Sequence, residues 1–131
     1  MRALVSFCRL NGIEFEFKEV DLFEGEHMKP ENAKLNPAKQ VPFIEEVDER
    51  SGQKFMIAES HAIMRYLADS RGCDDHWYPK DLRKRAKVNQ YLDEHHNYIR
   101  MGVGVHIFKR FFAPMINGKS YSDRELQDNW W

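Results

Sequence analysis

The chain has 131 residues, of which 42% are hydrophobic and 31% charged, and its formal net charge is −1. This is the composition of an ordinary globular domain, and interspersed acidic and basic residues give no field that would attract nucleic acid or membrane. No apolar run approaches the roughly 18 residues of a membrane span, and the first apolar stretch is too short for a signal peptide. We therefore expect a cytoplasmic protein with no nucleic-acid or membrane partner, in which Cys8 and Cys73 are free thiols.

The first part of the chain is predicted to alternate helices with an extended segment. Apolar residues at helical spacing indicate a helix over residues 3–10, which Asn11-Gly12 would end. Phenylalanines that alternate with charged residues indicate a half-exposed strand over residues 15–20. Pro30 suits the first turn of a short helix that runs to about residue 35.

A hairpin and another helix are predicted next. Apolar residues at 43–47 and 55–58 flank a polar turn at 48–52, as in two antiparallel strands. Apolar residues then share one face of a helix that ends at Arg71-Gly72, namely Ala62, Ile63, Tyr66 and Leu67.

The remainder is predicted to be helical. A linker over residues 73–80 precedes a long helix over residues 81–113, whose first residue, an aspartate, is a suitable N-cap. Gly102 and Gly104 weaken this helix by about 1 kcal/mol each relative to alanine and permit a bend. A further helical pattern with a capping sequence begins the stretch 122–131.

Two short motifs flank the hairpin and indicate a binding site. Val41 precedes Pro42 at the start of a strand, so its N–H and C=O can pair with an extended peptide, and a cis bond at Pro42 would direct them outward. Ser60 begins a helix, so its hydroxyl and the free N–H groups of the first turn can hold a carboxylate. Together the motifs predict a site for glutathione. Taken singly, they are more often just a strand start and a helix N-cap.

The two pairs belong to a longer series of short motifs, and the resemblance that these carry extends to about residue 117. They are Arg2-Ala3-Leu4, Asn11-Gly12-Ile13, Val20-Asp21-Leu22, Gly25-Glu26-His27, Asn36-Pro37, Val41-Pro42, Glu59-Ser60, Ile63, Tyr66-Leu67, Asp75-His76-Trp77-Tyr78-Pro79, Asp81-Leu82 and Arg85-Ala86. In these motifs the chain resembles the theta class of the cytosolic glutathione S-transferases. The resemblance implies an α/β thioredoxin-like glutathione-binding domain over residues 1–72, a linker over residues 73–80, and the start of an all-α C-terminal domain over residues 81–131.

The resemblance also implies a function. Such enzymes bind glutathione as co-substrate, lower the pKa of its thiol and deliver the thiolate to a small electrophile in detoxification, as homodimers. Val41 and Pro42 match the pair that recognises the peptide backbone. Glu59 would accept the α-amino group of the γ-glutamyl end, and Ser60 would donate to its carboxylate.

Further candidates follow from the same resemblance. His27 and Gln40 match residues at the glycine end of glutathione, where Gln40 replaces a lysine and Lys39 could compensate. Asn97 and Arg100 match positions that line the electrophile site, where an arginine would suit an anionic leaving group. From the residues alone, His27 is equally a solvated loop histidine, and Asn97 and Arg100 are equally a solvated helix face.

No metal site is expected. His95 and His96 are adjacent, so they project about 100° apart on a helix, and neither has a histidine four residues away. The basic run Arg83-Lys84-Arg85 diverges around its helix and indicates a solvated face.

Activity is the open point of the sequence. The resemblance places Met1 within the first helix, so we expect a chain truncated at both ends, without the first strand and without the serine that stabilises the thiolate. In that fold the first strand is central, so its absence would leave backbone groups of the neighbouring strands without hydrogen bonds. We therefore expect the chain alone to fold poorly. The alternative function is a non-catalytic glutathione-binding or dimerising fragment or isoform, which pairs with full-length subunits if Phe55 or Met56 is exposed. A glutathione-fold domain recruited for protein assembly is a third hypothesis.

Overall fold

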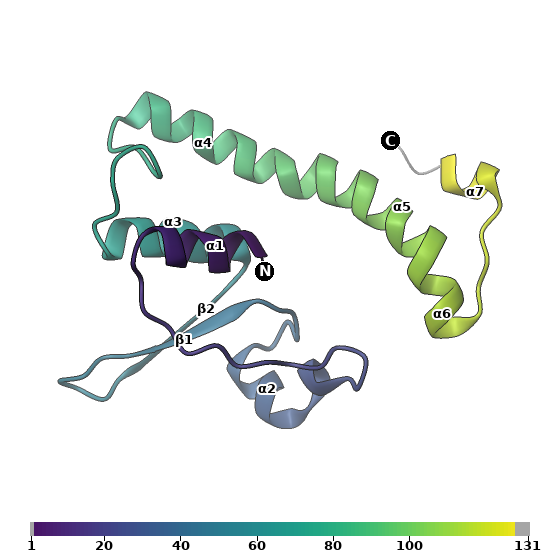
Figure 1. The fold of residues 1–131 in the computed structure, drawn as a ribbon, viewed down its shortest axis with the longest axis horizontal. Coiled ribbons are helices and arrows are strands. Elements are labelled where there is room, and N and C mark those ends of the chain that lie inside the picture. Colours follow the sequence, from purple (N-terminus) through teal and green to yellow (C-terminus); the bar gives the residue numbers. More distant parts are fainter. Residues whose placement is uncertain (1, 128–131) are drawn as a thin grey trace. The chain divides into compact units, whose positions relative to one another are not determined.

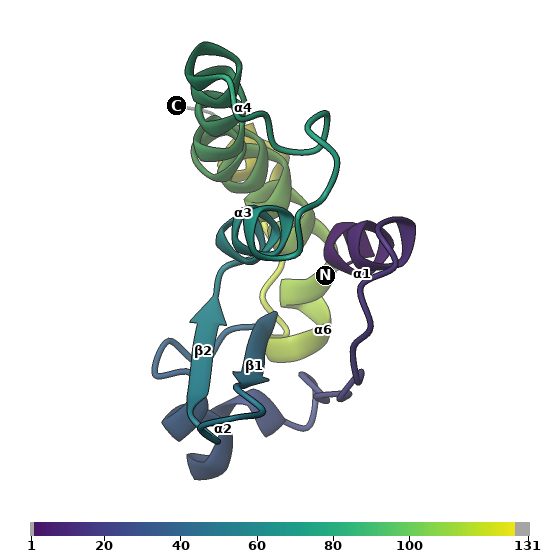
Figure 2. The same cartoon turned by 90° about the vertical axis from the view of Figure 1, so that its left-hand side faces the viewer.

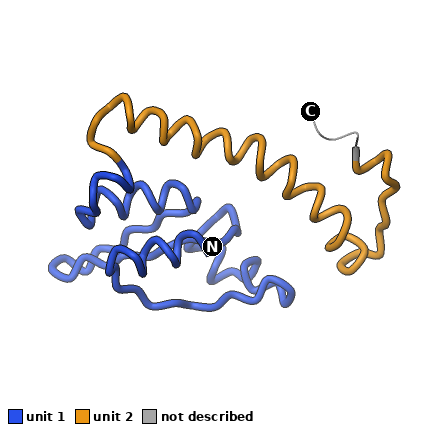
Figure 3. The backbone as a smooth tube through the Cα atoms, turned by 45° about the horizontal axis from the view of Figure 1, so that its top comes forward, with its two compact units in different colours: residues 1–78 blue, residues 79–131 orange. Residues whose placement is uncertain are grey.

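The computed structural model describes residues 2–127 and divides into two compact units, residues 1–78 and 79–131 (Figure 3). In chain order the elements are α1 (Arg2–Leu10), the 3-10 helix η1 (Glu26–Met28), α2 (Pro30–Leu35), β1 (Phe43–Val47), β2 (Lys54–Ala58), α3 (Ser60–Ser70), α4 (Leu82–Glu94), the π-helix η2 (His95–Gly104), α5 (Val105–Ile107), the π-helix η3 (Phe108–Phe112), α6 (Ala113–Asn117) and α7 (Asp123–Gln127) (Figure 1).

The core of the first unit lies between α1 and α3, which run side by side (Figure 2). Both helices turn an apolar stripe toward each other, as the helical spacing of the sequence predicts. The Trp77 ring closes one edge of this core, with its centroid 5.3 Å from that of Phe7. The buried members of the cluster are Leu4, Phe7, Cys8, Ile63, Leu67 and Ala68.

Both core helices end in the same hydrogen-bond arrangement, at the glycines that the sequence indicated. After α1, the Ile13 N–H donates to the Cys8 carbonyl at 2.9 Å, and Gly12 has a φ of 63°. After α3, the Cys73 N–H donates to the Ala68 carbonyl at 3.0 Å, and Gly72 has a φ of 60°. This is the Schellman motif, in which a left-handed residue, usually glycine, lets the chain turn back on the last helical carbonyls. The predicted ends of both helices are confirmed.

The predicted hairpin is confirmed. β1 and β2 pair antiparallel, and the register sets Ile44 opposite Ile57 and Phe43 opposite Ala58. Both isoleucines pack against the α1–α3 core. In the turn, the Asp48 carboxylate accepts the N–H of Ser51 at 2.7 Å, which fixes the reversal of the chain.

The predicted strand over residues 15–20 is wrong. The only sheet in the described part of the chain has the order β1–β2, and residues 13–20 belong to no helix or strand. Phe15 is 44% exposed and Phe17 is 56% exposed. Alternation predicts which face of a strand would be apolar, but a strand also needs a neighbour that takes up its backbone groups, and none is described beside this segment.

In the second unit, α4 begins at the predicted cap. The Asp81 carboxylate accepts the Lys84 N–H at 2.9 Å. The predicted single α-helix over residues 81–113 needs a correction, because two stretches of it, η2 and η3, have π-helical hydrogen bonding. The backbone stays right-handed helical across each junction, so Gly102 and Gly104 lie within the π stretch and do not break the helix.

The last described helix also matches the sequence. The Ser122 N–H donates to the Glu125 carboxylate at 3.0 Å and the Glu125 N–H donates to the Ser122 hydroxyl at 3.4 Å, which forms the predicted capping box before α7. The Trp130–Trp131 pair lies outside the described residues. Within residues 2–127, none of the helices has the length and apolar character needed to cross a bilayer.

Candidate functional site

The hairpin register brings the two predicted motifs to the same end of the sheet. Phe43 opens β1 and lies opposite Ala58, which closes β2. Pro42 therefore precedes one strand at the point where Glu59 follows the other. Because paired residues of antiparallel strands have Cα atoms about 4.5–5.5 Å apart, the two motifs are close neighbours although 17 positions separate Pro42 from Glu59 in the sequence.

Val41 lies before the ladder begins, so β2 does not take up its backbone groups. The Val41–Pro42 peptide bond is cis. Both side chains are half-buried, and Gln40 is exposed. The structure thus leaves the Val41 backbone beside the hairpin end, where the sequence analysis expected it.

The segment before Val41 is held by Asn36, whose side chain is buried. Its amide nitrogen donates to the Gln40 carbonyl at 2.7 Å, and its amide oxygen accepts the Ala38 N–H at 3.2 Å. The Lys39 N–H donates to the Asn36 carbonyl at 2.9 Å, with Lys39 at a φ of 54°. One buried side chain therefore fixes the turn that leads into Val41. In the sequence, Asn36-Pro37 stands only as part of a family motif, and this role was not predicted, although asparagine is a frequent former of local side-chain turns.

Glu59 occupies the single residue between β2 and α3. It has a φ of 70° and a ψ of 113°, a conformation rarely seen outside glycine. Such backbone outliers cluster at binding and catalytic sites, where the surrounding structure holds them. The Glu59 carbonyl accepts the first hydrogen bond of α3, from the Ile63 N–H at 2.9 Å. Ser60 is the first residue of this 11-residue helix, whose N-terminus carries partial positive charge.

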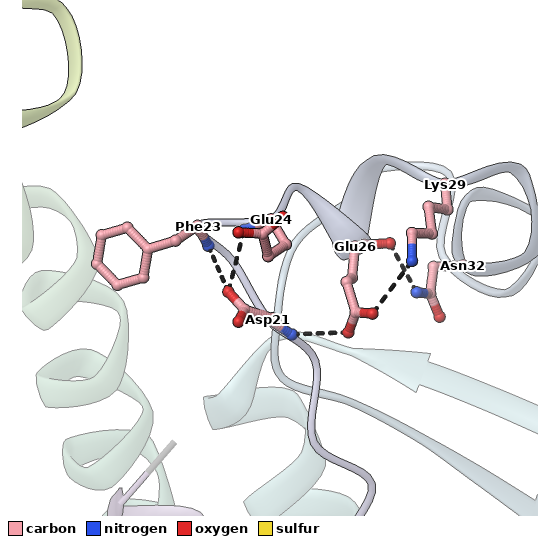
Figure 4. Close-up of polar contacts among 6 residues, drawn as sticks. All are labelled: Asp21, Phe23, Glu24, Glu26, Lys29 and Asn32. Atoms are coloured by element: carbon pink, nitrogen blue, oxygen red, sulfur yellow. Dashed lines mark hydrogen bonds and ion pairs between the residues drawn. The ribbon is translucent and has the colours of Figure 1, made fainter.

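The loop that carries His27 is braced by hydrogen bonds and one ion pair (Figure 4). The Asp21 carboxylate accepts the N–H of Phe23 at 2.8 Å and that of Glu24 at 3.0 Å. The Glu26 carboxylate accepts the Asp21 N–H at 2.9 Å and pairs with Lys29 at 3.1 Å. These two contacts, with the Asp21 N–H the larger cause, lower the pKa of Glu26.

His27 itself follows Glu26 in η1 and is half-buried. The Asn32 amide donates to the Glu26 carbonyl at 2.8 Å and joins η1 to α2. Among the described residues, the His27 Nδ1 atom is buried and has no hydrogen-bond partner. A buried polar atom without a partner is costly, which makes this nitrogen a candidate for contact with a ligand.

Asn97 and Arg100 lie on η2, in the second unit, and both are exposed. They are three residues apart, the spacing of neighbours on an α-helix, but the i to i+5 hydrogen bonds of a π-helix put more residues into each turn. The Arg100 guanidinium instead lies 3.4 Å from the His96 ring nitrogen. Within residues 2–127, no group of three or more histidine, cysteine, aspartate or glutamate side chains is placed to hold a metal ion.

The chain is similar in sequence and structure to known proteins. Residues 1–69 match the family model described as "Glutathione S-transferase, N-terminal domain". The chain belongs to the glutathione S-transferase family. It is 36% identical to rat glutathione S-transferase theta-2 over 128 residues. The alignment covers 98% of this chain and 50% of the rat protein. The predicted theta-class relationship is confirmed. The chain spans about half the length of the curated relatives it matches.

Solved structures give the same result. Human glutathione transferase theta-2, in complex with glutathione and an unknown ligand, superposes with a TM-score of 0.83 at 34% identity, over 98% of this chain and 50% of that one. A human theta-class enzyme in complex with the glutathione conjugate of 1-menaphthyl sulfate gives the same TM-score, identity and coverage. The first unit is thus a thioredoxin-like glutathione S-transferase domain with a two-stranded sheet, followed by the start of the helical domain.

Proposed function

We propose that this chain binds glutathione at the end of the hairpin where Val41–Pro42 and Glu59–Ser60 meet, as part of a theta-type glutathione transferase. The observation that carries the proposal is the register, which sets a backbone-pairing element and a helix N-terminus side by side. The solved relative that contains glutathione supports the same ligand.

In this proposal each residue has a stated task. The Val41 N–H and C=O pair with the backbone of the tripeptide, as in strand addition. Ser60 and the first-turn N–H groups of α3 hold the γ-glutamyl carboxylate, and Glu59 accepts the α-amino group. His27 and Gln40 contact the glycine end, where the buried His27 Nδ1 would gain a partner.

The electrophile side belongs to the second unit in this proposal. Asn97 and Arg100 line it, and the exposed guanidinium of Arg100 would stabilise a leaving group that departs as an anion. The theta-class relative that contains a conjugate of 1-menaphthyl sulfate supports an electrophile of that general kind. No residue of this chain is assigned to stabilising the thiolate, so the proposal covers binding first and transfer second. The proposed domain limits stay at residues 1–72, 73–80 and 81–131, with a cytoplasmic role in detoxification.

Calorimetric titration with glutathione tests the site. Ser60→Ala removes one hydrogen bond to a charged group, worth about 1.5–3 kcal/mol, so glutathione affinity should fall roughly 10- to 100-fold. Ser6→Ala is the matched control, because Ser6 is an exposed residue of α1 in the same unit. Equal affinities for wild type and Ser60→Ala would reject the assigned site. A conjugation assay with a small aryl or alkyl halide then asks whether bound glutathione reacts.

One observation favours a second role, as a pairing module. Phe55 of β2 is 43% exposed, with its ring 5.0 Å from that of Tyr66, whereas Met56 is half-buried. An exposed aromatic of this kind is typical of the anchor residues of interfaces. We propose that the chain forms a homodimer or pairs with full-length theta subunits through this face. Size-exclusion chromatography of the chain, alone and with a full-length theta subunit, should show a complex that Phe55→Ser weakens. Separate elution of all components would remove the proposal.

A further inference from the structure

Both cysteines of the chain lie at the α1–α3 core, and the glutathione site described above uses neither. Cys8 is buried, with 5% of its surface exposed, whereas Cys73 is half-buried and packs against the cluster to which Cys8 belongs. Both thiols are free. The Cys73 Sγ lies 3.9 Å from the Leu67 carbonyl, so its thiol sits against the last turn of α3.

The two thiols are also coupled electrostatically. The pKa of Cys8 is raised, first by burial and second by the charge of Cys73. Cys8 lies in the last turn of α1, and the Cys73 Sγ lies against the last turn of α3, the helix that packs beside α1. A raised pKa lowers the thiolate fraction of Cys8, so the more exposed Cys73 is the thiol that a reagent in solution reaches first, and Cys8 attacks only a disulfide already held at the same core.

We propose that Cys73 is a modification site for a small disulfide such as glutathione disulfide, and that Cys8 is the resolving thiol that converts the product into an internal Cys8–Cys73 disulfide. Packing of both thiols at one core cluster is what carries this assignment. It does not rest on the proposed function, because the reagent approaches the α1–α3 core and not the hairpin end.

Two thiol–disulfide exchange steps form the internal disulfide. The Cys73 thiolate attacks one sulfur of glutathione disulfide, the S–S bond of the reagent breaks, and one glutathione leaves as a thiolate that takes up a proton. The Cys8 thiol then loses its proton and attacks the Cys73 sulfur, which breaks the mixed disulfide and releases the second glutathione. The protein is oxidised by two electrons, and one glutathione disulfide is reduced to two glutathione thiols.

Intact-mass analysis after incubation with glutathione disulfide, without reductant, tests the proposal on three forms of the full chain. Wild type should lose the mass of two hydrogens and yield a Cys8–Cys73 cross-linked peptide on digestion. Cys8→Ala should stop at a stable mixed disulfide, because the resolving thiol is gone. Cys73→Ser, the matched control, should stay unmodified, because Cys8 is buried.

The same experiment can overturn the proposal. A stable glutathione adduct on wild type, a disulfide-linked dimer, or no reaction at all would each reject an internal disulfide. If Cys8→Ala proves unfolded by circular dichroism, the cross-linked peptide from wild type decides the question alone. Wild type unfolded in denaturant provides the positive control, since both thiols should then react.

Discussion

Replacing Asn36 by alanine should loosen the turn that leads into Val41. The substitution removes two hydrogen bonds, to the Gln40 carbonyl at 2.7 Å and from the Ala38 N–H at 3.2 Å. At a net 0.5–1.5 kcal/mol for each bond, the free energy of unfolding should fall by about 1–3 kcal/mol. With a urea m value of about 2 kcal/mol per molar, the midpoint of unfolding should move down by about 1 M.

The assay is urea unfolding followed by circular dichroism, together with calorimetric titration of glutathione under native conditions. Asn117→Ala is the matched control. Its side chain also accepts one backbone N–H, from Lys119 at 3.0 Å, but it is exposed in the second unit, so the change in unfolding free energy should stay within about 0.5 kcal/mol. Glutathione affinity should fall in Asn36→Ala alone. An Asn36→Ala protein as stable as the control, with unchanged affinity, would refute the assigned role of this side chain.

Three further predictions concern separate contacts. The Tyr66 hydroxyl donates to the Glu46 carboxylate at 2.7 Å and is the largest cause of the lowered pKa of Glu46. A carboxyl group whose pKa is lowered on folding adds stability at pH values above its unfolded-state pKa. Tyr66→Phe should therefore lower the free energy of unfolding by about 1 kcal/mol near neutral pH. The difference from wild type should vanish as the pH falls through the folded pKa of Glu46, as urea unfolding at several pH values will show. Asp81→Ala removes the cap of α4 and should reduce helical circular dichroism and cost about 1 kcal/mol, unlike exchange of the exposed Asp74. His27→Phe should weaken glutathione binding in calorimetry while leaving the unfolding midpoint within error; unchanged binding would make His27 a structural loop residue.

Most of the first unit could be predicted from the sequence because its signals are local. Helix ends at Gly12 and Gly72 depend on a left-handed residue, and that requirement is visible in the sequence. The hairpin follows from two short apolar runs around a turn of polar residues. The segment at residues 15–20 failed because pairing depends on a neighbouring strand, which alternation alone does not supply.

The site was only partly predictable, for similar reasons. The order of Val41–Pro42 and Glu59–Ser60 indicated a shared ligand, and the register then brought them together. The asparagine at position 36 suggests a local side-chain turn, but its burial depends on the packing around it, and the positive φ of Glu59 has no signal of its own in the sequence. The π-helical stretch from His95 was equally hidden, because helix propensity does not distinguish hydrogen bonds to the fourth residue from those to the fifth.

The most direct test of the proposed glutathione site is a titration of the ¹⁵N-labelled chain with glutathione, monitored through the chemical shifts of its backbone amides. The amide signals of Val41, Ser60 and His61 should shift together with one dissociation constant, whereas the chemical shifts of the hairpin turn at residues 48–52 should not change. Shifts confined to other parts of the chain, or none at all, would contradict it.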